Sequence, residues 1–130
     1  MNILGVDYGE KRIGLAWMQT GLDVVLPFGK IEVKNKESAL GELVKLIKEE
    51  KIDEVIFGLP FNLDGTENKH TDKIINFSVM LKARVDVEVE YMNEMFSSQQ
   101  ADKMGDGVSR DEKSAMVILE SYKNRNKNKE

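Results

Sequence analysis

The sequence predicts an α/β domain built on a five-stranded mixed sheet, with three antiparallel strands plus two parallel strands, flanked by helices. Two observations carry this prediction. Three short extended segments joined by turns open the chain, and such segments pair as antiparallel neighbours. Helical segments then alternate with single extended segments, a pattern that adds parallel strands to a sheet. Of the 130 residues, 41% are hydrophobic and 32% charged, which is typical of a globular domain able to bury a core.

The three opening segments are expected to form a meander. Residues 2–8 are almost entirely apolar, as in a central strand buried on both faces. A turn follows, and residues 12–18 return as the second strand. A third extended segment spans residues 24–33, where Pro27 and Gly29 interrupt it.

After the meander, helices and strands alternate. Hydrophobic residues recur at helical spacing in two segments, and in the second of these Ile74, Phe77 and Leu81 are expected to face inward. The expected elements are, in chain order, a helix near 36–51, a strand at 53–58, a helix at about 71–84, a half-exposed strand at 85–91, and helices near 97–104 and 111–123. This order is that of an RNase H-like domain.

Composition excludes several classes of protein. The formal net charge of −4 argues against coating nucleic acid through an overall positive field, although an enzyme can still grip a phosphodiester locally through metal ions. Without cysteine there is no disulfide framework, thiol nucleophile or thiolate metal site. The first residues reach charged positions too early for a signal peptide, and no apolar run approaches the length of a membrane span. We therefore expect a cytoplasmic protein without membrane attachment.

A single domain is expected over residues 1–122. Residues 123–130 carry four basic side chains against one acid and almost nothing to bury. They are therefore expected to form a basic, flexible tail. The alternative is a weak phosphate-binding arm.

Asp7 is the most informative single residue. It lies within an otherwise apolar strand, where a carboxylate is costly unless it is paired or binds a cation. The nearby Gly9 and Gly14 would let a phosphate chain or a metal ion approach the backbone closely. The alternative is that Asp7 accepts hydrogen bonds from the N–H groups of the turn.

Two further acids stand where strands end and helices begin. Glu94 follows the alternating strand, beyond the carboxyl end where open α/β sheets build their sites, but it also suits the first turn of a helix. Asp111 opens the last predicted helix, where aspartate is a preferred N-cap. Each acid has its own structural explanation, whereas one metal site would explain all three.

Other polar residues allow two interpretations each. After residue 58, Pro60 shapes a loop in which Asn62 and Thr66 could bind a phosphate or a ribose hydroxyl, or could simply form a turn. His70 is the only histidine of the chain. With no second histidine or cysteine, zinc is not expected, and a solvent-facing or helix-capping role is favoured.

Four motifs, in order and at matching spacing, carry a family resemblance. They are Gly5-Val-Asp7-Tyr-Gly9 with Arg12-Ile-Gly-Leu-Ala16, Gly58-Leu-Pro60 with Asp64-Gly65-Thr66, Asn93-Glu94 with Ser97-Ser98, and Asp111 ahead of Ala115 and Ile118-Leu119. Over residues 3–122 the chain thereby resembles the YqgF/RuvX family of pre-16S rRNA nucleases, also described as Holliday junction resolvase-like.

The resemblance implies an RNase H-like, metal-dependent endonuclease acting in 5′-end maturation of 16S rRNA. Asp7, Glu94 and Asp111 take the places of the family's three catalytic, metal-binding carboxylates. Such hard oxygen ligands suit two Mg²⁺ or Mn²⁺ ions, which activate a water and stabilise the leaving oxygen. The implied partners are pre-rRNA or branched DNA and ribosomal precursor particles, with the chain a monomer or a homodimer.

The residues expected to bind substrate are Gly9, Lys11, Arg12, Asn62, Thr66 and Arg110. The chain departs from the family at two positions, since Ile75 and Met95 stand where an arginine is usual. Fewer cations weaken the grip on a phosphate backbone, because fewer counterions are released. Because of this departure, the alternative function of a noncatalytic RNase H-like module that binds nucleic acid remains open.

A third possibility is a nucleotide binder. The pattern Asp7-x-Gly9-x₄-Gly14 resembles the first phosphate loop of actin-like ATPases and sugar kinases. Those proteins close a second domain over ATP, for which 130 residues leave no room.

Overall fold

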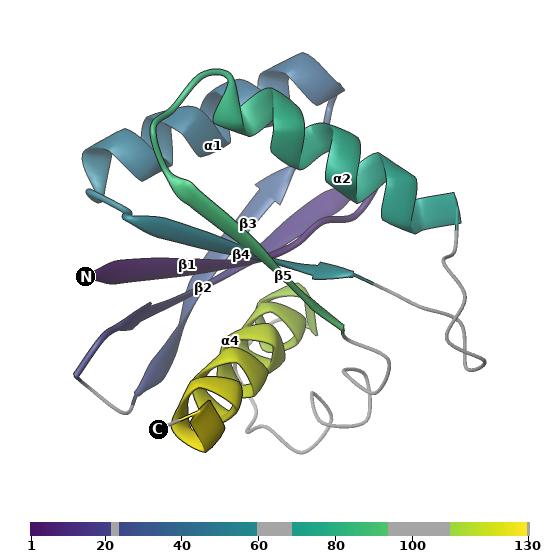
Figure 1. Cartoon of the computed structure of the whole chain (residues 1–130). Coiled ribbons are helices and arrows are strands. Elements are labelled where there is room, and N and C mark those ends of the chain that lie inside the picture. Colours follow the sequence, from purple (N-terminus) through teal and green to yellow (C-terminus); the bar gives the residue numbers. More distant parts are fainter. Residues whose placement is uncertain (22–23, 60–68, 94–109, 130) are drawn as a thin grey trace.

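The computed structural model describes residues 1–21, 24–59, 69–93 and 110–129 (Figure 1). The helix expected near 97–104 lies outside this part of the chain. The described elements are β1 (Asn2–Asp7), β2 (Arg12–Gln19), β3 (Val25–Glu32), α1 (Lys36–Glu49), β4 (Glu54–Leu59), α2 (Lys69–Lys82), β5 (Glu88–Asn93) and α4 (Arg110–Lys129).

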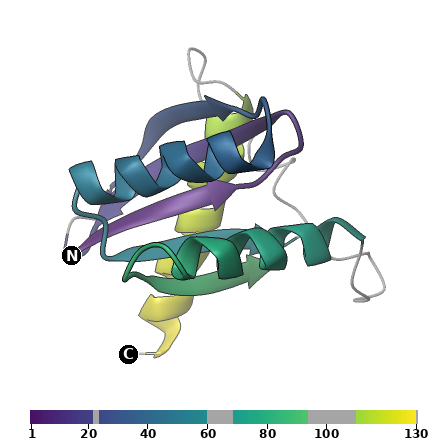
Figure 2. The same cartoon turned by 90° about the horizontal axis from the view of Figure 1, so that it is seen from above.

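The five strands form one mixed sheet in the order β3-β2-β1-β4-β5. The meander β1–β2–β3 is antiparallel, and β4 and β5 continue the sheet in parallel with β1. The predicted fold class is therefore confirmed, including the central position of β1. Helices α1 and α2 lie side by side on one face of the sheet, and α4 crosses the other face (Figures 1 and 2).

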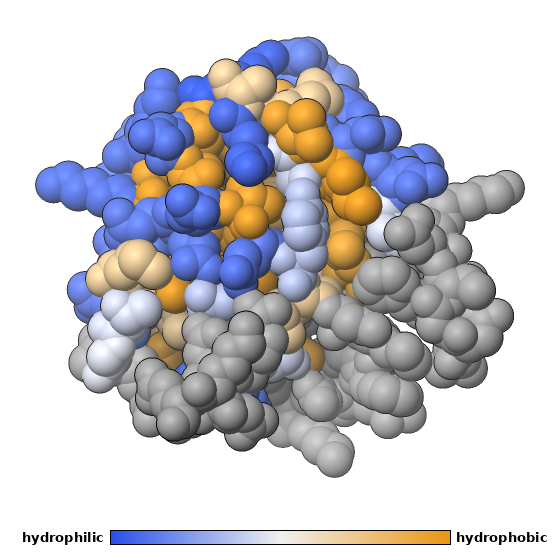
Figure 3. Space-filling model, in the orientation of Figure 1, coloured by the Kyte–Doolittle hydropathy of each residue, from blue (hydrophilic) through white to orange (hydrophobic). Residues whose placement is uncertain are grey.

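Each face of the sheet has its own hydrophobic core. Under α1 and α2 lies the larger core, which includes the fully buried Phe57 and Phe77. The predicted inward-facing residues of α2 are confirmed, since Ile74, Phe77 and Leu81 are all fully buried. Figure 3 shows hydrophilic side chains over much of the surface of α1 and α2, with apolar ones visible between them. This is the pattern of amphipathic helices laid on a sheet.

The smaller core lies under α4. Alternate residues of the central strands, among them Ile3, Ala16 and Ile56, pack there against Ala115 and Leu119 of the helix. Burial of apolar surface on both faces explains why β1 and β4 read as nearly continuous hydrophobic runs.

The bounds of several elements differ from those expected by two or three residues: α1 ends at Glu49, α2 spans Lys69–Lys82 and β5 spans Glu88–Asn93. Asn35 caps α1, because its side-chain oxygen accepts a hydrogen bond from the Ser38 N–H at 2.8 Å. Helix α4 begins at Arg110 and runs to Lys129, beyond the end expected near residue 123. The division of the chain into a domain and a tail stays a prediction. No helix in the described residues is long and apolar enough to span a bilayer.

Candidate active site

One edge of the sheet gathers the ends of several elements. The parallel strands β1, β4 and β5 end there at Asp7, Leu59 and Asn93. Strand β2 runs in the opposite direction, so Arg12, its first residue, lies at the same edge. Open α/β sheets build their sites at the carboxyl ends of such strands.

Asp7 lies on the α4 side of this edge. Side chains alternate along a strand, and Ile3 and Gly5 both face α4: Ile3 packs in the core under the helix, and a methyl group at Gly5 would lie 2.6 Å from Leu119 Cγ. Asp7, two residues further along, continues that row and is half-buried. The strand thus directs the Asp7 carboxylate toward the face that carries α4.

Asp111 reaches the same place through close packing of α4 on β2. The register pairs Asp7 with Gly14, and a methyl group at Gly14 would lie 1.9 Å from the carbonyl oxygen of Asp111. Carbon and oxygen atoms that are not bonded to each other never approach so closely. Only glycine at position 14 therefore lets the first turn of α4 lie here. The backbone of Asp111 therefore rests on the β2 residue directly beside Asp7.

This packing corrects one interpretation of the sequence. Gly14 was expected to let a phosphate chain or a metal ion approach the backbone, but the backbone of α4 fills that space. Gly9 also has a structural explanation, because a methyl group there would lie 2.5 Å from the Arg12 carbonyl oxygen across the turn. The role of Gly9 in substrate binding stays a prediction.

Arg12 joins the two elements electrostatically. Its Nε lies 3.1 Å from Oδ2 of Asp111, and the two side chains are 46% and 29% exposed. An ion pair this exposed contributes little to stability. Its effect is instead to orient the Asp111 carboxylate at the edge and to place a guanidinium, which binds phosphate well, beside it.

A second contact fixes the start of α4 on the neighbouring strand. The Gly29 N–H donates to Oε2 of Glu112 at 2.8 Å. Gly29 has φ of 105°, which strongly favours glycine, and it lies next to an irregularity in the pairing of β2 with β3. The first turn of α4 is therefore held to β2 through Asp111 and to β3 through Glu112.

Some of the predicted site residues lie close together at this edge, and others are not among the described residues. Arg12 pairs with Asp111 at the edge described above, Asp7 occupies the strand position beside the backbone of Asp111, and Lys11 is exposed in the adjoining turn. Within the described part of the chain no three potential ligands cluster as a metal site. The predicted residues whose side chains fall outside the described set are Asn62, Thr66, Glu94, Met95 and Arg110.

Two further expectations bear on the site. Ile75, which stands where the family usually carries an arginine, is half-buried and packs against the larger core, so α2 offers no cation from this position. The Nε2 atom of His70 lies 3.1 Å from the backbone oxygen of Tyr8; because a carbonyl only accepts, Nε2 donates. This contact gives His70 a structural role that needs no metal.

Sequence reasoning missed the pairing of Arg12 with Asp111. These residues are 99 positions apart, so no local pattern could join them. The available signal was the pair of residue types. Arg12 at the start of β2 and Asp111 near the start of α4 are both predicted site residues, but nothing in the sequence links them.

Comparison with solved structures places this arrangement in a known class of folds. RuvC from Thermus thermophilus superposes with a TM-score of 0.64 over 96% of this chain and 96% of its own, at 12% sequence identity. The chain has the RuvC-like form of the RNase H fold.

The family follows from the sequence match. The family model described as "RuvX: Holliday junction resolvase" matches residues 1–125, and the chain belongs to this family. A relative from Dictyoglomus turgidum, named "Putative pre-16S rRNA nuclease", is 34% identical over 94% of this chain and 93% of its own. A relative of the same name from Nitratidesulfovibrio vulgaris is 35% identical over 95% and 94%.

Proposed function

We propose that the chain is a metal-dependent endonuclease of the cytoplasm that hydrolyses a phosphodiester bond during 5′-end maturation of pre-16S rRNA. The observation that carries this proposal is that Asp7 and the backbone of Asp111 occupy neighbouring positions at one edge and on one face of the sheet. The names of the relatives support RNA of the ribosomal precursor as the substrate.

The donor set suits a hard divalent cation. Asp7 and Asp111 offer carboxylate oxygens, and the motif match makes Glu94, which follows the last residue of β5 in the sequence, the third acid. Carboxylates without thiolates or imidazoles favour Mg²⁺ or Mn²⁺ over zinc. When bound, two such ions would activate a water and stabilise the leaving oxygen.

The chain's own residues prepare this chemistry. The close packing at Gly14 fixes the backbone of Asp111, so its carboxylate is placed before any ligand arrives. Arg12 balances the negative charge of Asp111 and, being nearly half exposed, can also donate to a phosphate oxygen of the substrate. Asp7, Asp111 and the guanidinium of Arg12 thus occupy neighbouring positions along one edge of the sheet.

The decisive experiment separates metal binding from cleavage. Calorimetric titration with Mn²⁺ and cleavage of a 5′-extended 16S rRNA precursor are measured for the wild type, Asp7→Asn and Asp111→Asn. Both variants should lose metal binding and cleavage while remaining folded. The matched control is Asp86→Asn, an exposed aspartate just before β5 at the opposite edge, which should retain both.

Other outcomes would contradict the proposal in distinct ways. Binding of the RNA without cleavage by the wild type would indicate a noncatalytic module, for which the apolar Ile75 supplies a reason. Tight binding of ATP together with weak binding of Mn²⁺ alone would favour a nucleotide binder. Unfolding of Asp7→Asn would show that Asp7 is structural.

A further inference from the structure

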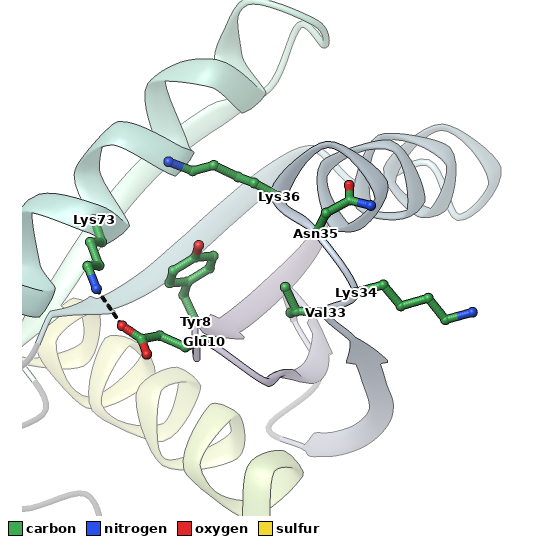
Figure 4. Close-up of a pocket in the computed structure, with 7 residues that line it drawn as sticks. All are labelled: Tyr8, Glu10, Val33, Lys34, Asn35, Lys36 and Lys73. Atoms are coloured by element: carbon green, nitrogen blue, oxygen red, sulfur yellow. Dashed lines mark hydrogen bonds and ion pairs between the residues drawn. The ribbon is translucent and has the colours of Figure 1, made fainter.

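A surface cavity, open to solvent, lies at the same sheet edge but on the opposite face from the acids. It has a volume of about 340 Å³ and lies between the end of β1 and the helices α1 and α2 (Figure 4). It is lined by Tyr8, Glu10, Val33, Lys34, Asn35, Lys36 and Lys73. Tyr8 directly follows Asp7 in the sequence but belongs to the larger core. The two neighbouring residues therefore face opposite sides of the sheet, Asp7 toward α4 and Tyr8 toward the cavity.

The lining of the cavity is positively charged in an acidic protein. The lining residues include three lysines, one of them at the rim, and one glutamate, an excess of two positive charges, whereas the whole chain carries −4. Glu10 forms an ion pair with Lys73 that joins the β1–β2 turn to α2. In Figure 4 Lys36 extends toward α2, while Lys34 points away from Tyr8 at the rim. Such a lining attracts an anion.

Tyr8 supplies a rigid hydrogen-bond donor in the middle of the lining. Its ring packs on Phe77 with centroids 4.7 Å apart, and the side chain is only 8% exposed. Figure 4 shows its hydroxyl on the side of Lys36 and Lys73. Burial raises the pKa of the phenol, so the hydroxyl stays protonated at neutral pH and can donate.

The start of α1 completes the site. Asn35 caps the helix through the Ser38 N–H, and both Asn35 and Lys36 line the cavity. The N-terminal end of a fourteen-residue helix carries a partial positive charge that favours a phosphate. Donors from three separate elements therefore converge on one space.

The geometry points to a binding site for one nucleotide unit, whose phosphate is held by Lys36, Lys73 and the Tyr8 hydroxyl. The volume is at the small end of the range for ligand pockets, and it suits a mononucleotide rather than a long stretch of polymer. The nucleotide is either free or part of an RNA strand that passes over the edge from the acids. The assignment to an RNA strand rests on the proposed function, whereas the phosphate site itself does not.

The test measures binding in EDTA, so that cleavage and metal ions play no part. The probes are inorganic phosphate, uridine 5′-monophosphate and a short single-stranded oligoribonucleotide labelled with a fluorophore. Lys36→Gln combined with Lys73→Gln should weaken binding of the nucleotide and the oligonucleotide about tenfold, as loss of hydrogen bonds to a charged group does. Tyr8→Phe should weaken both less. Lys48→Gln, an exposed lysine in the last turn of α1, is the matched control and should change neither.

One variant should strengthen binding. Glu10→Gln releases Lys73 and increases the positive charge of the lining, so affinity should rise by about two- to fivefold, the size of an exposed charge interaction. Glu49→Gln removes the same charge from an ion pair elsewhere on α1 and should have no effect. Only a site at the cavity predicts this contrast between two equivalent charge changes.

The outcomes distinguish this inference from the proposed function. Binding of the mononucleotide and oligonucleotide that responds to these variants supports the site, even if the wild type fails to cleave RNA. The salt dependence of oligonucleotide binding should become shallower in the lysine variant, by about 0.7 for each phosphate that the protein no longer neutralises, and this change supports the RNA strand as the source. Unchanged affinity of all three probes in the lysine variant, or an equal loss in Lys48→Gln, would overturn the inference.

Discussion

The two faces of the sheet are built by opposite strategies. Under α1 and α2, large side chains such as Phe57 and Phe77 fill the space between helix and strand. Under α4 the smaller core is supplemented by two strand glycines that let the helix come close, since an added methyl group would meet the Leu119 side chain at Gly5 and the backbone of Asp111 at Gly14. One face is therefore sensitive to lost volume and the other to added volume.

This difference matches what each face holds. Close packing on the α4 side places the backbone of Asp111 beside the strand position of Asp7, and the proposed metal site requires such fixed positions of its acids. The face of α1 and α2 instead leaves a cavity near its edge, where long lysine side chains can adjust to a ligand. Under the two proposals, a rigid metal site and an adaptable phosphate site share one edge of the sheet.

The largest expected effect comes from deleting volume on the face of α1 and α2. Phe77→Ala removes a fully buried ring that packs on Tyr8 and Phe57, and it should cost about 4 kcal/mol of unfolding free energy. Urea denaturation measures this cost. Because the acids lie on the other face, the folded variant should still bind Mn²⁺ as the wild type does, and a parallel loss of metal affinity would contradict the separation of the faces.

Adding a single methyl group should break the other face. Gly14→Ala forces the first turn of α4 away from β2, and it should cost about 2 kcal/mol while also lowering affinity for Mn²⁺. The matched control is Gly41→Ala, an exposed helical position with nothing within 4 Å, which should stabilise the protein by about 0.5–1 kcal/mol. Both variants are compared by urea denaturation and calorimetry. A Gly14→Ala protein with wild-type stability would contradict the close packing.

The contrast between these glycines also shows how far the sequence could lead. The antiparallel meander, the parallel strands after it and the inward faces of the helices follow from local patterns, because alternation and helical spacing repeat within a few residues. The role of Gly14 does not, since a glycine in this strand could make room for a ligand as well as for a helix backbone. Only the long-range packing of α4 distinguishes the two, and the same limit hid the pairing of Arg12 with Asp111.

The cavity was missed for a related reason. Its lining comes from the end of β1, the following turn, the start of α1 and one side of α2. Each of these segments has an ordinary local explanation as a turn, a cap or a solvated helix face. Lys34 and Lys36 on either side of the helix cap were the one local signal, and it is a weak one.

A smaller effect on stability is expected from the hydrogen bond that attaches the start of α4 to β3. Glu112→Ala leaves the Gly29 N–H without its carboxylate acceptor and should cost about 1.5 kcal/mol, as expected for a hydrogen bond to a charged group. Glu112→Gln keeps a carbonyl acceptor and should lose less. Thermal unfolding compares the two variants. Equal destabilisation by both would show that the charge of Glu112 matters and its hydrogen bond to Gly29 does not.

The smallest effect tests the ion pair at the cavity through its pH dependence. Hydrogen bonding to Lys73 and its positive charge lower the pKa of Glu10 below its usual value of 4.5, and Glu10 likewise raises the pKa of Lys73 above 10.5. A lowered folded-state pKa gives stability that is present above the unfolded value and is lost as the pH falls through the folded one. The raised pKa of Lys73 gives stability that is present below pH 10.5 and is lost as the pH rises through its folded value.

Glu10→Gln should therefore slightly lower the unfolding free energy near neutral pH, and the difference from the wild type should vanish once the pH falls below the lowered folded-state pKa of Glu10, where its carboxylate is protonated. Both groups of the pair are exposed, so the difference should be small and should shrink further in high salt. Denaturation curves at several pH values measure it, with Glu42→Gln, an exposed glutamate elsewhere on α1, as the control. A difference that persists in acid would mean that Glu10 stabilises the turn by packing, and the lysine it releases in the variant would then be no freer to bind a phosphate.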